Sequence, residues 1–228
     1  MEGPGYTSAC IYNMAPLIEA MRRAGGPNLF ERPELQKAAY YYLYELRPNA
    51  AYFNNVNDAD FGAQCSFFPL FASVLDDPAL TWLWEVTDGT QREGNTIFGD
   101  NWSSWKSALP YVVLWHALAP EALHPDELDL PLSRRYSRRG MVSMRTGWDA
   151  ESCLLSFISG GNPDRGHSQM DANHFAIYCG ASILAFDSGY GARDTDDHNS
   201  LLFDGKGQTV YCREGRIDEY DDDGSACY

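Results

Sequence analysis

The residues best suited to chemistry lie in one stretch, residues 159–208. It holds three of the chain's five histidines, His167, His174 and His198, among acidic and amide side chains. Histidine gains and loses a proton near neutral pH, and together with carboxylates it binds zinc. These residue types therefore predict an active site or a metal site in this stretch.

Two short apolar segments within the stretch predict its scaffold. Residues 174–179 and 182–187 are rich in β-branched and aromatic side chains and are separated by Gly180 and Ala181, a pattern typical of a β-hairpin. A hairpin brings residues before its first strand next to those after its second, and a third strand over 198–203 would return His198 to the same end. The side chains expected to meet there are His167, Gln169, Asp171, Asp187 and His198.

The rest of the chain divides into a helical and a strand-rich part. Apolar residues recur at helical spacing over 15–24, 33–43, 67–75, 80–86 and 111–118, whereas short runs over 141–146 and 152–159 are typical of strands. We therefore predict an α+β multidomain chain, with a helical domain over 1–131 and an antiparallel β-domain over 132–228. Because neither end carries an obvious closing element, we expect truncation at both ends.

Composition limits the class of protein. A hydrophobic content of 44% and an aromatic content of 14% exclude disorder. The net charge is −15. No segment has the apolar length needed to cross a membrane, and we expect neither a nucleic acid partner nor insertion into a membrane. The six cysteines show no CxxC spacing, which disfavours a zinc ribbon and leaves disulfides and free thiols both open.

A run of arginines stands out against this acidic background. A concentration of positive charge close to the histidine stretch suits an anionic substrate, but it suits a solvated face or a seam between domains equally well. The arginines are Arg134, Arg135, Arg138, Arg139, Arg145 and Arg165.

Four blocks of sequence carry a resemblance to a known family. GHSQMDANHF (166–175), FDSGYG (186–191) and HNSLLFDGKGQ (198–208) follow one another in the order seen in heparinase II/III-like polysaccharide lyases. EGPGY (2–6) is similar to the segment that supplies the tyrosine of those enzymes. Two departures stand out: Gln169 replaces the second histidine of the pattern, and the helical Asn-His segment usually found upstream of Tyr6 is absent. We therefore expect this chain alone to be weakly active or inactive.

The resemblance implies a fold and a reaction. The fold is the end of an α/α toroid followed by the start of an antiparallel β-sandwich, and the reaction is β-elimination on a uronic acid-containing glycan. It maps the catalytic acid–base pair onto Tyr6 and His167. The residues expected to bind the acidic polysaccharide or oligosaccharide are Arg165, Asp171, Asn173, Tyr190 and Trp102.

The resemblance also implies a zinc ion, and no organic cofactor. The matching ligand positions are Gln169, Asp187 and His198, although a neutral amide is a poor third ligand for zinc. The alternative is a hydrogen-bonded polar cluster without a metal. For His174 we expect a core or supporting role.

Two other functions use the same residues. One is a carbohydrate-binding β-domain with a helical cap, and the other is a metal-dependent hydrolase with His167, Asp187 and His198 as ligands. Heparin, heparan sulfate, alginate and other uronates all remain open as the polymer. For the parent protein we expect the cell envelope, the periplasm or secretion.

Overall fold

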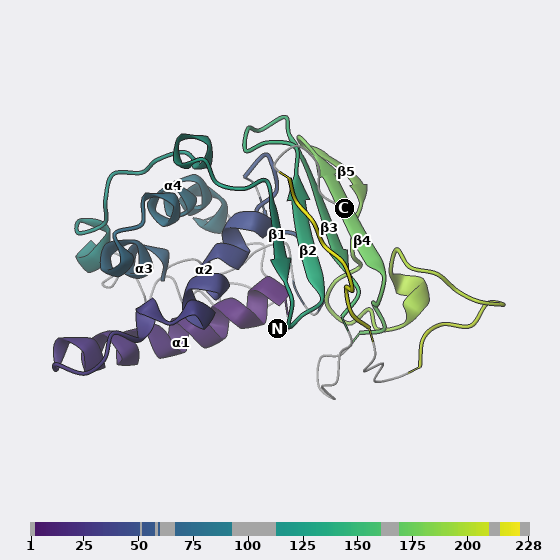
Figure 1. The fold of residues 1–228 in the computed structure, drawn as a ribbon, viewed down its shortest axis with the longest axis horizontal. Coiled ribbons are helices and arrows are strands. Elements are labelled where there is room, and N and C mark those ends of the chain that lie inside the picture. Colours follow the sequence, from purple (N-terminus) through teal and green to yellow (C-terminus); the bar gives the residue numbers. More distant parts are fainter. Residues whose placement is uncertain are drawn as a thin grey trace.

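A computed structural model describes residues 3–50, 52–57, 59, 67–92, 113–160, 169–209 and 215–223, with the side chains of 88–92 left out. It contains a helical layer packed against one face of a sheet (Figure 1). Its main helices are α1 (Gly3–Arg23), α2 (Pro33–Glu45), α3 (Phe68–Leu75) and α4 (Pro78–Arg92), and residues 113–116 are also helical. The short 3-10 helices are η1 (Leu29–Glu31), η3 (Pro125–Leu128) and η4 (Thr195–Asp197).

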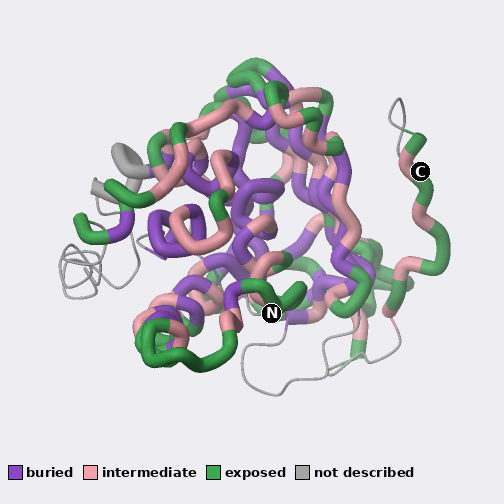
Figure 2. Tube along the Cα trace, turned by 60° about the vertical axis from the view of Figure 1, so that its left-hand side comes forward, coloured by how far each residue is buried: buried purple, intermediate pink, exposed green. Residues whose placement is uncertain are grey.

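Helix α2 is the centre of the helical layer. Pro33 lies in its first turn, where the missing N–H costs nothing. Its last five residues are all buried, as expected of a helix enclosed by protein. Figure 2 shows that the buried parts of the chain gather in the interior of the molecule. The hydroxyl of Tyr42 donates to the carbonyl oxygen of Pro4 at 2.7 Å, so α2 also holds the amino end of α1.

Helix α1 is longer than the sequence pattern predicted. The expected segment 15–24 is only its carboxyl half, because the helix begins at Gly3 and continues through Pro16. The prediction missed the first half because its small and polar residues show weak helical periodicity. Tyr6 consequently lies near the amino end of a long helix.

The sheet has five antiparallel strands in the order β1-β2-β3-β4-β5. They are β1 (Ser133–Tyr136), β2 (Met141–Arg145), β3 (Cys153–Ile158), β4 (His174–Cys179) and β5 (Ser182–Ala185). The strands predicted over 141–146 and 152–159 and the predicted hairpin are confirmed, as is the α+β class. The sequence pattern missed β1.

The third strand predicted over residues 198–203 is wrong. Residues 198–202 belong to no strand, and Phe203 forms only an isolated bridge with Lys206. The side-chain amide of Asn199 donates instead to the carbonyl oxygens of Phe175 at 2.9 Å and Phe186 at 3.0 Å. The segment is thus attached to the hairpin through a side chain and does not extend the ladder.

Polar residues lie where α2 meets the sheet. Ser143, Ser156 and Ala176 stand in register on β2, β3 and β4, and their small side chains let the helix approach. Glu45, fully buried at the end of α2, accepts hydrogen bonds from Ser143 and from Asn54. The layers therefore meet through a buried polar contact as well as apolar packing.

Most of the described arginines of this run lie where the helical layer meets the sheet. The Arg134 guanidinium lies over the rings of Tyr40 and Tyr44, and Arg145 donates to the carbonyl oxygen of Leu46 at 2.6 Å. Arg139 is ion-paired with Asp171. Arg138 is exposed, and Arg165 lies outside the described residues. Of the roles considered for this run, the structure favours a seam over a solvated face or a contact with an anionic substrate.

Cys153 and Cys179 form a disulfide between register partners on β3 and β4, while Cys10 is a free, exposed thiol. Within the described ranges, no helix combines the length and apolar character that crossing a bilayer requires.

Candidate functional site

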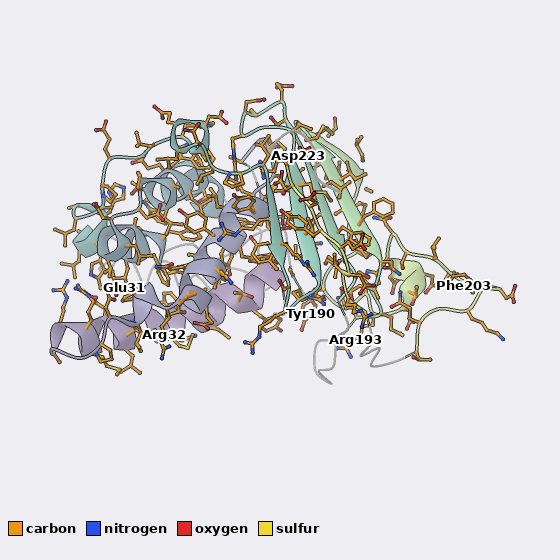
Figure 3. All side chains as sticks on the ribbon, viewed as in Figure 1. Glu31, Arg32, Tyr190, Arg193, Phe203 and Asp223 are labelled. Atoms are coloured by element: carbon orange, nitrogen blue, oxygen red, sulfur yellow. A yellow bond between two sulfur atoms is a disulfide. The ribbon has the colours of Figure 1, made fainter. Side chains whose placement is uncertain are left out.

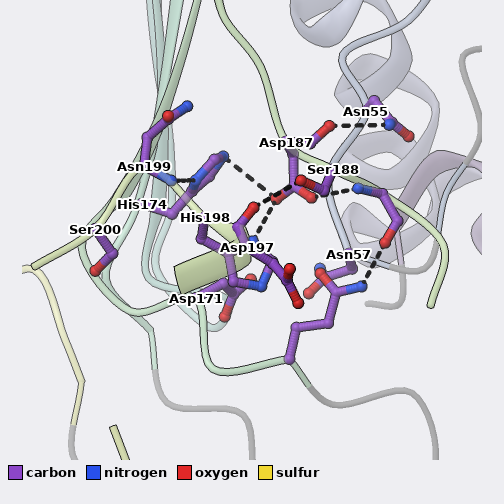
Figure 4. A network of polar contacts seen from close by, with 12 residues as sticks. Asn55, Asn57, Asp171, His174, Asp187, Ser188, Asp197, His198, Asn199 and Ser200 are labelled. Atoms are coloured by element: carbon purple, nitrogen blue, oxygen red, sulfur yellow. Dashed lines mark hydrogen bonds and ion pairs between the residues drawn. The ribbon is translucent and has the colours of Figure 1, made fainter. Parts of the chain in front are cut away.

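Two histidines and an aspartate converge at one end of the sheet (Figure 4). His174 is the first residue of β4, Asp187 follows β5 by two residues, and His198 follows η4. Asp187 Oδ2 lies 3.3 Å from His174 Nε2 and 3.3 Å from His198 Nδ1, and all three side chains are buried. The three ligand atoms lie within 4.8 Å of one another, close enough for a single metal ion to be considered.

Backbone contacts fix the ring of His174. The N–H of Asn199 donates to His174 Nδ1 at 3.1 Å, and the N–H of His174 itself donates to the carbonyl oxygen of Asp171 at 3.0 Å. Asn173 adopts a left-handed conformation, with a φ of 62°, directly before the strand. A tight turn therefore delivers His174 into the sheet with one ring nitrogen already engaged.

The second carboxylate oxygen of Asp187 fixes the following turn. Oδ1 accepts from the N–H of Gly189 at 2.7 Å, and the carbonyl oxygen of Gly189 accepts from Gln169 Nε2 at 3.0 Å. The carbonyl oxygen of Asp187 also accepts from Asn55 Nδ2 at 3.2 Å. Gly189 is therefore held from both sides and from the helical layer.

This turn places one tyrosine against another. Tyr190 follows Gly189, and its ring stacks on that of Tyr6 with centroids 6.5 Å apart and planes inclined by 26°. Tyr190 lies at the end of the sheet near the start of α1 (Figure 3). Tyr6 and Tyr190, predicted separately as catalytic and substrate-binding residues, are thus neighbours across the two layers.

Burial lowers the pKa of both histidines, whereas the negative charge of Asp187 raises it, and the balance differs between the two. Burial lowers the pKa of His174, with the nearby charge of Asp187 opposing this only in part. Burial also lowers the pKa of His198, but the contact with the Asp187 carboxylate and its charge outweigh it, so that the pKa of His198 is raised. The pKa values of the two histidines therefore diverge, and His198 is the more easily protonated of the two.

Asp171 and Asn173 take different positions. Asp171 is buried and forms an ion pair with Arg139 at 3.0 Å, and the same Arg139 nitrogen donates to Asn57 Oδ1 at 2.8 Å. Asn173 is exposed, and its Oδ1 accepts from the Ser159 hydroxyl at 2.7 Å. Three further predicted residues, Trp102, Arg165 and His167, lie outside the described residues.

Sequence reasoning missed several residues that hold this end of the sheet. Asn55 comes from the polar loop after α2, Asn199 from the segment after η4, and Gln208 bonds both backbone groups of Ala172. A histidine directly after a polar turn and at the start of a strand was the available signal for His174. The partners that lie 25 or more residues away left no such signal in the sequence, because a local pattern does not indicate which distant residues are in contact.

Comparison with known proteins identifies the fold. No family model and no curated protein matches the chain. A heparinase III crystal structure matches with a TM-score of 0.63 at 18% identity, over 95% of this chain and 33% of that one. The heparan sulfate lyase HepC from Pedobacter heparinus matches with a TM-score of 0.61 at 14% identity, over 91% and 30%. A further heparinase III structure, with methylated lysines, gives 0.52 at 15% identity, over 78% and 24%.

This chain therefore spans about a quarter to a third of the length of the lyases it matches. At these identities the likeness concerns the fold. The chain has the fold of part of the heparinase III and heparan sulfate lyase structures, which confirms at that level the resemblance carried by its motifs.

Proposed function

We propose that this chain forms part of a polysaccharide lyase that cleaves uronic acid-containing glycans by β-elimination. The observation that carries the proposal is the stacking of Tyr6 from α1 on Tyr190 from the turn fixed by Asp187. It brings a phenol of the helical layer to the end of the sheet where His174, Asp187 and His198 converge. A site between two layers is a usual place for a carbohydrate cleft.

The reaction needs one base and one acid. The base removes the proton at C5 of the uronate, the electron pair forms the C4–C5 double bond as the bond from C4 to O4 breaks, and the acid protonates the departing O4. Tyr6 and His167 supply these two roles. The exposed ring of Tyr190, beside Tyr6, offers a surface on which a sugar ring can stack.

Substrate contacts complete the proposal. Asn173 is exposed at the same end of the sheet, and Arg165 and Trp102 keep the substrate-binding roles that the sequence predicts. Asp171 acts indirectly, because its carboxylate is buried against Arg139. The helices then belong to an α/α toroid and the sheet to one layer of a β-sandwich.

Two observations bear on substrate and location. The matched structures carry the names heparinase and heparan sulfate lyase, so heparan sulfate is the first polymer to test. The Cys153–Cys179 disulfide favours an oxidising compartment, which supports the cell envelope, the periplasm or secretion for the parent protein.

Product chemistry tests the proposal. The purified chain is incubated with heparan sulfate, heparin and alginate, and the ultraviolet absorbance of unsaturated uronate ends is followed. Even if turnover is slow, Tyr6→Phe and His167→Ala are expected to lower it by about 100-fold or more, the usual contribution of a general acid or base. Tyr12→Phe is the matched control, because Tyr12 lies on the same helix and is likewise half-buried.

The alternatives give different products. Folded protein that binds these glycans and forms no double bond, either as this chain or as a version extended upstream of Tyr6, would favour the carbohydrate-binding function. Cleavage that leaves saturated ends would favour the hydrolase. Equal losses in Tyr6→Phe and Tyr12→Phe would contradict the assignment of Tyr6.

A further inference from the structure

A short stretch of irregular backbone is buried between the helical layer and the sheet. Residues 55–57 and 59, termed the spacer loop, follow α2 and belong to no helix or strand. The exposed fractions of Asn55, Val56, Asn57 and Ala59 are all 4% or less. Loops usually run over the surface, where water satisfies their backbone polar groups. A loop buried this deeply is expected to have a structural or functional role.

One side of the spacer loop packs against the start of α1. A Cβ at Gly3 would lie 2.3 Å from the carbonyl oxygen of Val56 and 2.9 Å from the Cβ of Ala59. Only glycine therefore allows the backbone to approach the loop this closely. Gly3 lies three residues before Tyr6, which is about one turn of the helix. The loop thus fixes the position of the end of α1 that carries Tyr6.

The other side of the spacer loop packs against the turn that carries Tyr190. Asn55 Nδ2 donates to the carbonyl oxygen of Asp187 at 3.2 Å (Figure 4). A Cβ at Gly189 would lie 2.3 Å from Asn55 Nδ2 and 2.8 Å from the carbonyl oxygen of Ala59. Ala59 thus contributes its side chain to the contact with α1 and its carbonyl group to the contact with this turn.

Hydrogen bonds also anchor the spacer loop to the sheet independently of that turn. Asn57 Oδ1 accepts from an Arg139 nitrogen at 2.8 Å, and Arg139 lies between β1 and β2. Just before the loop, Asn54 accepts from the Tyr178 hydroxyl at 2.9 Å and donates to Glu45 at 2.6 Å. The loop therefore cannot shift toward either neighbour without breaking buried hydrogen bonds.

We propose that the spacer loop sets the separation of Tyr6 and Tyr190, with Asn55 as the positioning residue on the Tyr190 side. Each tyrosine lies within three residues of a glycine that the loop contacts, so a shift of the loop moves one ring relative to the other. The ring centroids lie 6.5 Å apart. Displacing a catalytic group by about 1 Å can lower turnover about 100-fold. The catalytic value of the loop rests on the proposed function, whereas its effect on the two rings does not.

Removal of the Asn55 hydrogen bond tests one side of the loop. Asn55→Leu keeps most of the side-chain volume and loses the donor to Asp187, while Ser143→Ala removes a different buried hydrogen bond between the layers. Both variants are expected to lower the melting temperature by about 2–6 °C. Only Asn55→Leu should shift the Gly189 amide signal and weaken the nuclear Overhauser contact between the two tyrosine rings.

A second pair of variants tests the Tyr6 side and does not depend on Asn55→Leu remaining folded. Gly3 and Gly25 share a φ of +84°, but a side chain at Gly25 would enter open space. Alanine lowers stability at both positions because of the positive φ, and only at Gly3 does it also collide with the spacer loop. We expect Gly3→Ala to weaken the contact between the tyrosine rings and Gly25→Ala to leave it unchanged.

The contact between the tyrosine rings decides the outcome. An unchanged contact in folded Asn55→Leu or in folded Gly3→Ala would overturn the proposal. Equal changes in Ser143→Ala and Gly25→Ala would also overturn it, because they would assign the effect to a general loss of stability. None of these measurements uses lyase activity. If the variants behave as expected in a chain that forms no unsaturated product, this inference stands and the proposed function fails.

Discussion

At the scale of single residues, Gly189 leaves no room for a side chain. Its φ is +77°, and a Cβ there would lie 2.3 Å from Asn55 Nδ2 and 2.8 Å from the carbonyl oxygen of Ala59. Gly191, two residues on, has a similar φ of +86° but open space around it. Comparing these two glycines separates the cost of placing a side chain at a positive φ from the cost of a steric clash.

We predict that Gly189→Ala lowers the free energy of unfolding by about 2–3 kcal/mol and Gly191→Ala by about 1 kcal/mol. Both variants place an alanine in the left-handed conformation, which lowers stability. Only Gly189→Ala must also displace Asn55. Urea denaturation of the two variants measures the difference. Equal losses of stability in the two variants would show that Asn55 moves aside without a cost in free energy.

Arg139 gives a second prediction at this scale. Its guanidinium is the described partner of the buried Asp171 carboxylate. Arg139→Ala is expected to lower the free energy of unfolding by about 3–5 kcal/mol, because it leaves a buried charge without compensation. Arg138→Ala, at the exposed neighbouring position, should change it by less than about 0.5 kcal/mol. Similar values for the two variants in urea denaturation would contradict a structural role for the ion pair.

At the scale of elements, the contact between α2 and the sheet depends on one carboxyl group. Burial raises the pKa of Glu45 above its ordinary value of 4.5, although hydrogen bonds from Ser143 and Asn54 and the charge of Arg145 oppose the rise. The folded state therefore holds the Glu45 proton more tightly than the unfolded chain does. Its contribution to stability is largest below pH 4.5 and is lost as the pH rises through the raised pKa.

We predict that Glu45→Gln reduces this loss of stability between pH 4.5 and pH 8. Each unit by which the pKa is raised corresponds to about 1.4 kcal/mol. Unfolding in urea across this range measures the effect, and Glu34→Gln, at an exposed position on the same helix, is the control. The same pH dependence in wild type and Glu45→Gln would assign it to other groups.

Elements whose determinants are local were predictable from sequence, and elements fixed by distant partners were not. The β4–β5 hairpin follows from β-rich segments around Gly180, which adopts a φ of 55° in the turn. Strand β1 escaped notice because its arginines read as a polar surface, whereas Arg134 packs on tyrosine rings of α2. The contact that fixes the ring of His174 was equally hidden, since it comes from the backbone N–H of Asn199, which lies 25 residues further along the chain.

At the scale of the whole molecule, the Cys153–Cys179 disulfide joins the end of β4 to the start of β3. We predict that Cys153→Ala/Cys179→Ala lowers the free energy of unfolding by about 2–4 kcal/mol and removes any sensitivity of the melting temperature to a reductant. Cys10→Ala should leave both unchanged, because Cys10 is a free, exposed thiol. A melting temperature of the wild type that does not respond to reductant would contradict the pairing.

The candidate site joins segments that are made at very different times. Asn55 and Asp187, which bond across the two layers, are separated by 132 residues. During synthesis the helical layer emerges long before β4 and β5. The polar groups of α2 and of the loop after it are therefore hydrated by water until their partners are synthesised. The Tyr6–Tyr190 contact forms only once the turn after β5 has left the ribosome. The site therefore assembles late: a chain that ends before residue 187 has the main helices and all five strands of the sheet but lacks Asp187 and His198.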